Sequence, residues 1–307
     1  MSEKKHLDFL IQNFQEKRPL RAGSLIITLY GDAIVPRGGT VWLGCLMKLL
    51  EPIGINERLV RTSVYRHTQE SWLQAEKVGR RSYYSVTGSG LRRFERAFTQ
   101  VYQLNNQQWE GSWCLIFLSQ LENTKRRLLR EELEWMGFGP LTPNVMMHPW
   151  LKPADISPLL QEQEVFDDVI VMQSKPQELL SSRALRLQVK ESWNIDHLAS
   201  KYIQFIEQFR PLWLELAANN NLTNEECFIA RTLLIHEYRK VLLRDPQLPE
   251  ELLPVDWAGR NARQLCRNIY RTIYESADLW LDQHLENASG PLPSPNANFY
   301  QRFGGLK

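Results

Sequence analysis

The chain has 307 residues, of which 43% are hydrophobic and 23% are charged, and its net charge is +2. This composition supports packed cores in two or three domains and argues against a disordered chain. No run of about 18 apolar residues occurs, and the first residues lack the apolar segment of a signal peptide. We therefore expect a cytoplasmic protein and neither a membrane protein nor a secreted one.

The four cysteines, Cys45, Cys114, Cys227 and Cys266, are widely separated, and none belongs to a C-x-x-C pair. This spacing argues against a zinc site and against a disulfide framework. Each cysteine has an apolar neighbour, so we expect buried thiols and no bound metal.

Positive charge is concentrated in the first third of the chain. Residues 1–100 contain 16 Lys and Arg against 9 Asp and Glu, whereas the remaining residues contain 21 against 26. The first segment is thus at +7 and the rest at −5. A basic segment of this kind indicates a polyanionic partner for that segment, provided that a binding motif coincides with it.

Three short helices are predicted at the start of this basic segment. Ser24 is placed to cap the first helix, which runs to residue 30, and the glycines at 38 and 39 interrupt the chain. Residues 41–50 show a helical stripe of apolar side chains. A turn at residues 52–55 then leads to a third helix capped by Asn56.

The third helix, up to Glu70, has two distinct faces. Val60, Val64 and His67 fall on one side, which we expect to face the core, so that His67 is a core or rim residue and not a ligand. The opposite side carries groups suited to phosphates and base edges. We predict that this side contacts DNA through Arg58, Arg61, Thr62, Tyr65, Arg66 and Gln69.

A charged β-hairpin follows at once, with strands at residues 73–77 and 82–86 and a turn between them. Of two successive tyrosines, one should pack on the helices and the other should reach DNA, and we assign the DNA contact to Tyr83 together with Arg80 and Arg81 at the turn. A plain surface hairpin is the alternative interpretation. Helix and hairpin together predict a winged helix-turn-helix that binds duplex DNA.

The middle segment, residues 106–175, begins with a polar linker and then alternates between strands and helices. Its apolar and helical patterns predict strands at residues 113–118, 144–148 and 168–172, and helices at residues 124–136 and 153–161. We expect a ferredoxin-like α+β domain, for which one further strand has to be assumed because no pattern reveals it.

From residue 176 to the end the chain is predicted to be helical, with a proline-rich loop at residues 245–254. The expected helices span residues 178–190, 195–217, 224–243 and 259–285. The predicted fold class is therefore α+β and multidomain. It comprises a winged helix at residues 1–105, the ferredoxin-like domain, and an all-α effector and dimerisation domain at residues 176–307.

Short stretches spread over nearly the whole chain include Tyr30-Gly31-Asp32, Arg37-Gly38-Gly39, Val60-Arg61-Thr62, Gly79-Arg80-Arg81-Ser82-Tyr83-Tyr84, Gly137-Phe138-Gly139, Phe209-Arg210-Pro211-Leu212, Trp257-Ala258-Gly259, Ala262-Arg263-Gln264-Leu265-Cys266 and Gln301-Arg302-Phe303-Gly304-Gly305-Leu306. In this order they resemble the PaaX family, the transcriptional repressors of phenylacetate catabolism. The resemblance implies a homodimeric repressor with a palindromic operator, released by phenylacetyl-CoA. It also implies a middle domain similar to the small CRISPR-adaptation nuclease fold.

The chain departs from the family pattern at two positions. Ser71 stands where the end of such a helix often has glycine, and His67 stands at an apolar position. Neither residue belongs to the predicted DNA face, so the departures concern the packing of the helix.

The resemblance does not identify the residues that bind the effector. A CoA thioester requires cations for its phosphates and an apolar or aromatic pocket for its acyl group. The C-terminal half offers the candidates Arg210, His236, Tyr238, Arg239, Lys240 and Trp257. The alternative is that Arg239 and Lys240 form the cationic last turn that a helix favours.

Two other classes of function compete with the repressor. An enzyme is disfavoured for two reasons. The carboxylates of Asp167-Asp168 and of Glu131-Glu132 are adjacent in sequence, so they diverge on a helix or strand and cannot act as a pair. The strand predicted at residues 113–118 has no carboxylate that could hold metal ions for two-metal chemistry. A ligand-independent architectural DNA-binding protein is the remaining alternative. It would need only about the first hundred residues, and an effect of an acyl-CoA on operator binding would distinguish the two.

Overall fold

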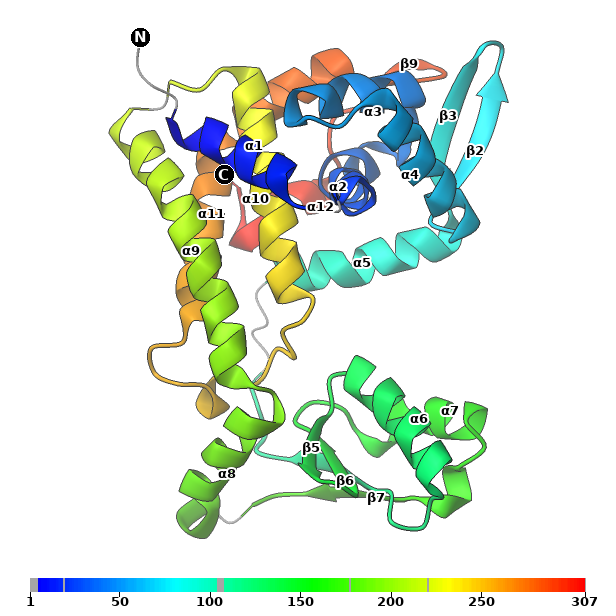
Figure 1. The fold of residues 1–307 in the computed structure, drawn as a ribbon, viewed down its shortest axis with the longest axis vertical. Helices are drawn as coiled ribbons and strands as arrows, with labels where there is room; N and C mark the ends of the chain where they lie inside the picture. Colours follow the sequence, from blue (N-terminus) through cyan, green and yellow to red (C-terminus); the bar gives the residue numbers. More distant parts are fainter. Residues whose placement is uncertain (1–4, 19, 104–107, 177, 220, 307) are drawn as a thin grey trace. The chain divides into compact units, whose positions relative to one another are not determined.

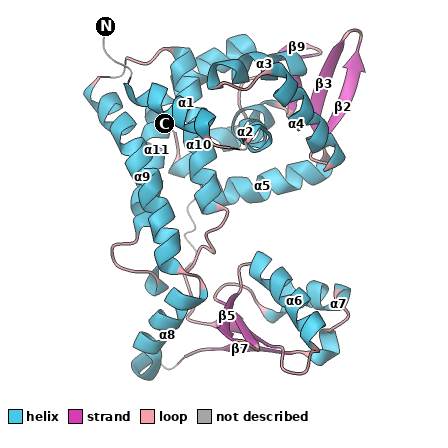
Figure 2. Ribbon diagram, viewed as in Figure 1, coloured by secondary structure: helices cyan, strands magenta, loops and turns pink. Residues whose placement is uncertain are grey.

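The computed structural model describes residues 5–18, 20–103, 108–176, 178–219 and 221–306. Figure 1 traces the chain, and Figure 2 shows that helices outweigh strands. The chain divides into two compact units, one built from residues 1–105, 202–243 and 259–307, the other from residues 106–201 and 244–258. Most of the C-terminal helices thus share a unit with the basic N-terminal segment. The predicted linker at residues 105–108 lies largely outside the described residues.

Within the described residues, the N-terminal part of the first unit contains five α-helices and a three-stranded sheet. The helices are α1 (Lys5–Glu16), α2 (Ala22–Leu29), α3 (Leu43–Leu50), α4 (Glu57–Gln69) and α5 (Gly88–Tyr102). The strands β1 (Thr40–Trp42), β2 (Leu73–Val78) and β3 (Arg81–Val86) form an antiparallel sheet in the order β1-β3-β2. The hairpin β2–β3 follows α4 and projects beside it (Figure 1).

Two expectations for this part were wrong in detail. The first residues of the predicted second helix belong to strand β1 instead. Val41 pairs with Tyr84 of β3, and the β-branched residues Thr40 and Val41 favour an extended chain. Ser24 is not a cap, since α2 already begins at Ala22, and Arg21 occupies the N-cap position.

The ends of α4 are fixed by local hydrogen bonds. At the start, the Asn56 side chain accepts the Leu59 N–H at 2.9 Å, as predicted. Just after the end, Ser71 has φ +56°, a conformation that glycine adopts without strain, which explains why glycine suits this position. The Ser71 carbonyl accepts the hydroxyls of Thr87 at 2.6 Å and Ser89 at 2.9 Å, and these bonds stabilise the turn.

The second unit contains a four-stranded antiparallel sheet in the order β5-β6-β4-β7. Its elements in chain order are β4 (Trp113–Phe117), α6 (Asn123–Trp135), β5 (Gly139–Thr142), β6 (Val145–His148), α7 (Pro153–Glu162) and β7 (Ile170–Ser174). This order matches the expected ferredoxin-like arrangement. The strand that the sequence pattern did not reveal is β5, an irregular edge strand that contains Gly139 and Pro140.

Helix α8 (Glu178–Ser192) packs next to the β5 edge. The Ser192 hydroxyl donates to the Pro140 carbonyl at 2.6 Å, and the Trp193 indole N–H donates to the Gly137 carbonyl at 3.0 Å. The opposite edge strand, β7, leaves Ile170 53% and Met172 49% exposed. One edge of this sheet is therefore covered within the unit, whereas the other edge carries exposed apolar side chains.

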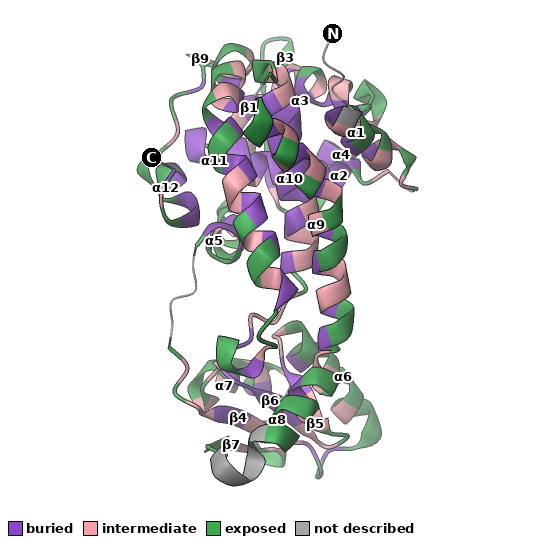
Figure 3. Cartoon of the chain, turned by 90° about the vertical axis from the view of Figure 1, so that its left-hand side faces the viewer, coloured by how far each residue is buried: buried purple, intermediate pink, exposed green. Residues whose placement is uncertain are grey.

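The remaining elements are α9 (Ile195–Ala218), α10 (Asn224–Leu242), α11 (Ala258–His284), the hairpin β8 (Glu286–Asn287) and β9 (Gly290–Pro291), and α12 (Ala297–Tyr300). Helix α10 is buried on several sides (Figure 3) and packs against α1, α2 and α5. A helix that is buried on most sides lies inside a core. Helix α10 therefore joins the N-terminal and C-terminal parts of the first unit.

All four cysteines are buried free thiols, as the sequence predicted. Burial raises the pKa of the Cys114 and Cys227 thiols to about 11, which keeps them protonated near neutral pH. Among the described residues, no helix is both long enough and apolar enough to cross a membrane.

Candidate nucleic-acid interface

Helix α4 presents the predicted side chains on one exposed face. Its core face consists of the buried residues Val60, Ser63, Val64 and His67, as expected except for the addition of Ser63. The other face is exposed to solvent and carries Arg58, Arg61, Thr62, Tyr65, Arg66 and Gln69. Tyr65 is 65% exposed, which is unusual for so large a side chain and leaves its ring free to contact a partner.

His67 attaches α4 to α2. Its Nε2 lies 3.0 Å from the Gly23 carbonyl, its Nδ1 lies 3.3 Å from Glu70 Oε2, and the side chain is 5% exposed. The prediction that His67 is a core residue is confirmed, and the polar ring has partners on both nitrogens, as a buried imidazole requires. The position of α4 therefore depends on α2.

The arginines of α4 form weak pairs within the helix. Arg61 lies 3.9 Å from Glu57, and Arg66 lies 3.5 Å from Glu70, with more than half of each arginine side chain exposed. Exposed pairs at this spacing contribute little stability, about 0.3–0.5 kcal/mol. The guanidinium groups can therefore exchange these carboxylates for phosphates or base edges at small cost.

The tip of the hairpin exposes Arg80. Val78 and Arg81 pair across the hairpin, so Gly79 and Arg80 form a two-residue turn, in which Gly79 has φ +60°. Glycine at the first central position is typical of such turns. Arg80 is thus held at the end of a short and well-defined ribbon.

The Arg81 side chain is held by contacts with other residues of the first unit. Its Nη1 forms a 2.7 Å ion pair with Glu286 of β8, and its guanidinium lies 4.2 Å from the centre of the Trp42 ring. A cation over an indole face is attracted by the ring quadrupole. Arg81 therefore attaches the hairpin to the C-terminal strand β8 while its side chain stays 50% exposed.

The assignment of Tyr83 to DNA was wrong. Tyr83 is 6% exposed and pairs with Trp42 on one side and Glu76 on the other, so it is the tyrosine that packs inward. Tyr84 is the partly exposed one, and its carbonyl accepts the Tyr30 hydroxyl at 3.1 Å. The alternation of a strand was predicted correctly, but sequence alone could not tell which tyrosine faced inward.

Helix α5 carries further exposed cations, Arg92, Arg93 and Arg96. The Arg93 guanidinium lies 4.9 Å from the centre of the Trp72 ring and donates to the Glu70 carbonyl at 3.4 Å. Arg93 therefore connects the end of α4 with α5.

A buried cluster of charges, which sequence reasoning missed, lies behind this surface. Asp32, just after α2, accepts Arg231 Nε at 2.6 Å, Arg302 Nη1 at 3.0 Å, and the hydroxyls of Tyr102 at 2.7 Å and Tyr270 at 3.0 Å. Burial by itself disfavours the carboxylate, but the two arginines outweigh it and hold the pKa of Asp32 below its usual range.

The cluster extends to the arginine of the Arg37-Gly38-Gly39 stretch. Arg37 Nη2 lies 2.9 Å from Asp278 Oδ1, which also accepts Arg231 at 2.7 Å. Arg302 has no exposed surface and lies between the rings of Tyr102 and Phe299, at 4.1 and 4.4 Å from their centres. The sequence contains one sign of this buried cluster, namely a charged residue inside an apolar run, as at Asp32 and Arg231.

The candidate effector residues do not form one site. His236 and Tyr238 are each 1% exposed, and His236 Nδ1 lies 3.2 Å from the Thr28 hydroxyl. Burial lowers the pKa of His236 to about 3, so the ring is neutral and cannot pair with a phosphate near neutral pH. These two residues belong to the core.

The other four candidates are dispersed. Arg210 is exposed on α9, Lys240 pairs with Glu237 at 2.9 Å, and Trp257 is buried in the second unit. Arg239 differs from all of these because it lines a pocket.

Comparison with known proteins identifies the family. Residues 21–90 match the family described as PaaX-like protein, residues 106–186 match the PaaX protein central Cas2-like domain, and residues 193–283 match the PaaX-like protein C-terminal domain. The chain is 43% identical over 301 residues to the Transcriptional repressor PaaX of Escherichia coli (strain K12), an alignment that covers 98% of this chain and 95% of that protein.

A solved structure shares the fold. The uncharacterized protein Rv0674 from Mycobacterium tuberculosis is 20% identical and aligns with a TM-score of 0.50 over 77% of this chain and 89% of its own. The chain is thus a mixed α+β protein with a Cas2-like middle domain and a helical C-terminal part. With its 43% identity to a repressor across nearly its whole length, it belongs to the PaaX family of DNA-binding transcriptional repressors.

Proposed function

We propose that this protein is a homodimeric winged helix-turn-helix repressor of a phenylacetate catabolic operon, released from its operator by phenylacetyl-CoA. The observation that carries the proposal is the exposed face of α4, with Arg58, Arg61 and Arg66 beside an arginine-tipped hairpin, in a chain that belongs to a repressor family. The relative's name supports a regulator and not an enzyme.

In this proposal, α3 and α4 are the helix-turn-helix, and α4 enters the major groove. Arg61 and Gln69 are the side chains suited to bidentate contacts with guanine and adenine, respectively. Arg58, Arg66 and Tyr65 flank them and are suited to phosphates. The contact of His67 with the Gly23 carbonyl holds α4 against α2 and would thereby set the angle at which α4 meets the groove.

The hairpin is the wing. Arg80 at its tip is suited to the phosphate backbone or the minor groove. Arg81 is held by Glu286 and Trp42, so its principal role is to set the position of the wing.

The proposed homodimer would place two such surfaces on the two halves of a palindromic operator. Support comes from the exposed edge strand β7, where Ile170 and Met172 offer apolar surface for a second copy. Sedimentation equilibrium of the purified chain measures this directly. A monomer at micromolar concentration would contradict the proposed stoichiometry.

The effector is tested by titration of an operator complex in a gel shift. Phenylacetyl-CoA should release the DNA, whereas free phenylacetate and CoA should release it much less. Full retention of the complex with all three compounds would contradict release by the thioester and would favour an architectural DNA-binding protein. The proposed site of action is the cytoplasm.

A further inference from the structure

The segment that follows α2 does not continue as a regular α-helix. It forms η1 (Tyr30–Ile34), one turn of π-helix, and then η2 (Val35–Arg37), a short 3-10 helix. The Val35 N–H donates to the Tyr30 carbonyl, whereas a regular α-helix would use the Gly31 carbonyl. Single π-turns are rare in helices and occur frequently at functional sites. The surroundings of this π-turn therefore have to explain why it forms.

Two backbone carbonyls of the π-turn accept hydrogen bonds from one distant side chain, Arg302. Its Nη2 donates to the Gly31 carbonyl at 3.2 Å, and its Nη1 donates to the Asp32 carbonyl at 2.9 Å. A guanidinium can reach both acceptors because its N–H groups form a rigid planar fork. Arg302 thus competes with the Val35 N–H for the Gly31 carbonyl, which favours the π register over the α register.

Pro36 removes the next hydrogen bond of the α register. In a regular α-helix the Asp32 carbonyl would accept the N–H of residue 36, but proline has no N–H. Arg302 supplies a donor to this carbonyl instead. The π-turn therefore depends on a proline within the segment and on an arginine from the C-terminal end of the chain.

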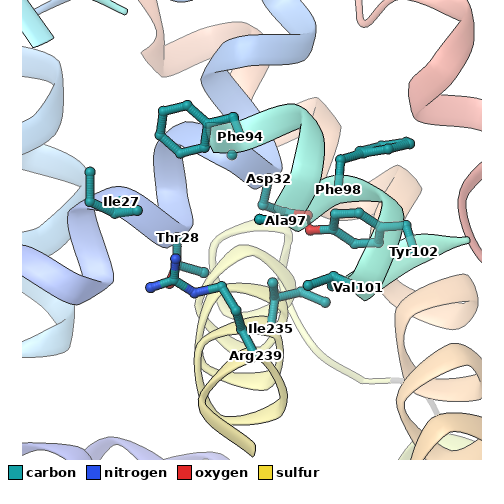
Figure 4. A pocket seen from close by; sticks show the side chains of 11 residues that line it. Ile27, Thr28, Asp32, Phe94, Ala97, Phe98, Val101, Tyr102, Ile235 and Arg239 are labelled. Atoms are coloured by element: carbon teal, nitrogen blue, oxygen red, sulfur yellow. Dashed lines mark hydrogen bonds between the residues drawn. The ribbon is translucent and has the colours of Figure 1, made fainter. Parts of the chain in front are cut away.

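Further contacts fix the orientation of Arg302. Its side chain has no exposed surface, and its Nη1 also donates to the Asp32 carboxylate at 3.0 Å. Its guanidinium lies over the Tyr102 ring, and Figure 4 shows the hydroxyl of that ring directed at the same carboxylate, which it contacts at 2.7 Å. These contacts hold the guanidinium in the orientation that reaches both carbonyls of the π-turn.

The C-terminal loop has the shape that presents Arg302. Gly304 and Gly305 have φ +83° and +111°, values that glycine adopts at little cost. The chain turns back at these two residues, and the Leu306 N–H donates to the Tyr300 carbonyl at 2.9 Å. The last stretch of the chain thus forms a compact loop with its arginine on the inner side.

The π-turn is coupled to α4 through α2. Helix α4 lies directly against the first turn of α2, where a Cβ at Gly23 would come within 2.8 Å of Arg66 Nη2. His67 Nε2 lies 3.0 Å from the Gly23 carbonyl. A register change of one residue turns an α-helix by about 100° and moves it by about 1.5 Å along its axis. Even a small part of this motion in α2 would break the contact with His67 and displace α4.

We propose that Arg302 is a positioning residue for DNA binding: it holds the π-turn at η1 and thereby sets the rotation of α2 and the position of α4. The proposal rests on the proposed function of α4 as the recognition helix. Base contacts require α4 to be placed to within the length of a hydrogen bond, whereas binding to an arbitrary duplex depends mainly on charge. Loss of the π register should therefore reduce binding to a preferred sequence selectively, in a chain that is still folded.

Two substitutions release the π register in different ways. Arg302→Lys keeps a positive charge beside Asp32 but lacks the fork that reaches both carbonyls. Pro36→Ala gives the Asp32 carbonyl a helical N–H donor and leaves every arginine in place. Arg271→Lys is the matched control, because Arg271 is exposed and donates to the Gly305 carbonyl of the same loop.

The DNA probes are a duplex that the parent protein selects from a random-sequence library and a shuffled duplex of the same length. Fluorescence anisotropy measures the affinity for both duplexes, and circular dichroism measures the folded fraction. Hydrogen exchange followed by mass spectrometry compares residues 57–69 of α4 with residues 224–242 of α10.

If Arg302 positions α4, both Arg302→Lys and Pro36→Ala lower the affinity for the selected duplex at least about tenfold, as the loss of one good base contact does. Affinity for the shuffled duplex stays within about threefold of the parent, and the folded fraction is unchanged. Exchange becomes faster in α4 and not in α10, and Arg271→Lys follows the parent in every measurement.

Three results would overturn the proposal. The first is parent-like affinity and exchange in Arg302→Lys. The second is an equal loss for both duplexes that follows a falling folded fraction, since this would show a purely structural role. The third is a parent-like Pro36→Ala beside a defective Arg302→Lys, which would assign the effect to the charges around Asp32 and not to the π-turn.

The exchange measurement separates this proposal from the proposed function. A parent protein that selects no duplex would overturn the proposed function. In that case, faster exchange confined to α4 in both Arg302→Lys and Pro36→Ala would still support the coupling from the π-turn to α4. Unchanged exchange in α4 would overturn the coupling as well.

Discussion

Arg61 and Arg80 are both exposed arginines, yet they belong to different elements and have different expected roles. Arg61 lies on the rigid face of α4, where a guanidinium can grip a guanine edge. Arg80 lies at the tip of a two-residue turn, where it can reach phosphates of any sequence. Their difference is testable because base contacts and phosphate contacts respond differently to sequence and salt.

Arg61→Ala should lower operator affinity by about 1–3 kcal/mol and relax base preference at one position. Arg80→Ala should weaken binding to all sequences alike and reduce the slope of log affinity against log salt by about 0.9. Both are measured by anisotropy titrations over a range of salt concentrations with operator and unrelated duplexes. Equal and salt-independent losses from both variants would contradict the assigned roles.

Asp32 is the residue on which the buried charge cluster depends. Asp32→Asn leaves Arg302 buried without a counter-ion and leaves Arg231 with Asp278 alone, so the free energy of unfolding should fall by about 3–5 kcal/mol. Urea unfolding followed by circular dichroism measures the loss. Asp282→Asn is the control, because Asp282 is half-exposed and lies 3.4 Å from Arg37, and its loss should be below about 1 kcal/mol. Similar losses for both variants would argue against a special role for Asp32.

His236 should make stability depend on pH. Its pKa is about 3 in the folded chain, against an ordinary value of 6.5, so below pH 6.5 the unfolded chain binds a proton that the folded chain does not. Stability is fully present above about 6.5 and falls by up to about 1.4 kcal/mol per pH unit between 6.5 and 3.

His236→Gln should flatten this decline by one proton when urea unfolding is measured from pH 7.5 to pH 5. His197→Gln, which changes an exposed histidine, is the control and should follow the parent profile. Parallel profiles for the parent and His236→Gln would show that His236 does not stay neutral in the folded chain.

At the scale of elements, the sequence predicted the helices and strands that are marked by local features such as caps, turns and periodicity. Helix α4 has its cap at Asn56 and a continuous core face, and the hairpin β2–β3 has a glycine turn between alternating strands, so both could be predicted. Strands β1 and β5 could not be predicted, because a segment of three or four residues is too short to show a periodic pattern. They are extended because a neighbouring strand, β3 or β6, supplies hydrogen bonds.

The contact between the hairpin β2–β3 and strand β8 also has a measurable consequence. Glu286→Gln removes the carboxylate that neutralises Arg81, so binding to all duplexes should strengthen and the salt slope should steepen by about 0.9. Glu215→Gln, which removes one negative charge from α9, is the control and should change the slope much less. An unchanged slope in Glu286→Gln would mean that Arg81 remains over Trp42 and does not reach phosphate.

At the scale of the whole molecule, the basic segment is not self-sufficient. Helices α1 and α2 pack on α10, and both arginines that neutralise Asp32 come from residues more than a hundred positions later. The C-terminal stretch Gln301–Leu306, prominent in the resemblance, thereby acquires a structural role through Arg302. The proposed DNA-binding surface and the helical C-terminal part are therefore expected to fold together.

A fragment of residues 1–105 should consequently fail to fold, because it exposes the α10-facing side of α2 and leaves Asp32 without its cations. Circular dichroism and the dispersion of an amide NMR spectrum measure this. A fragment of residues 108–201 is the control, since the core cluster from Cys114 to Val165 lies within it. A well-dispersed spectrum and operator binding by the 1–105 fragment would contradict the prediction.

By itself, the sequence determined the exposed cationic face of α4, the hairpin and the middle α+β pattern, because caps, turns and periodicity act over a few residues. Only the tertiary structure decided that Tyr83 faces inward, that His236 and Tyr238 are core residues, and that Arg81, Arg231 and Arg302 are used inside the first unit. The physical reason is that the burial and pairing of a polar side chain depend on residues far away in the chain. The spacing along one segment cannot encode those partners.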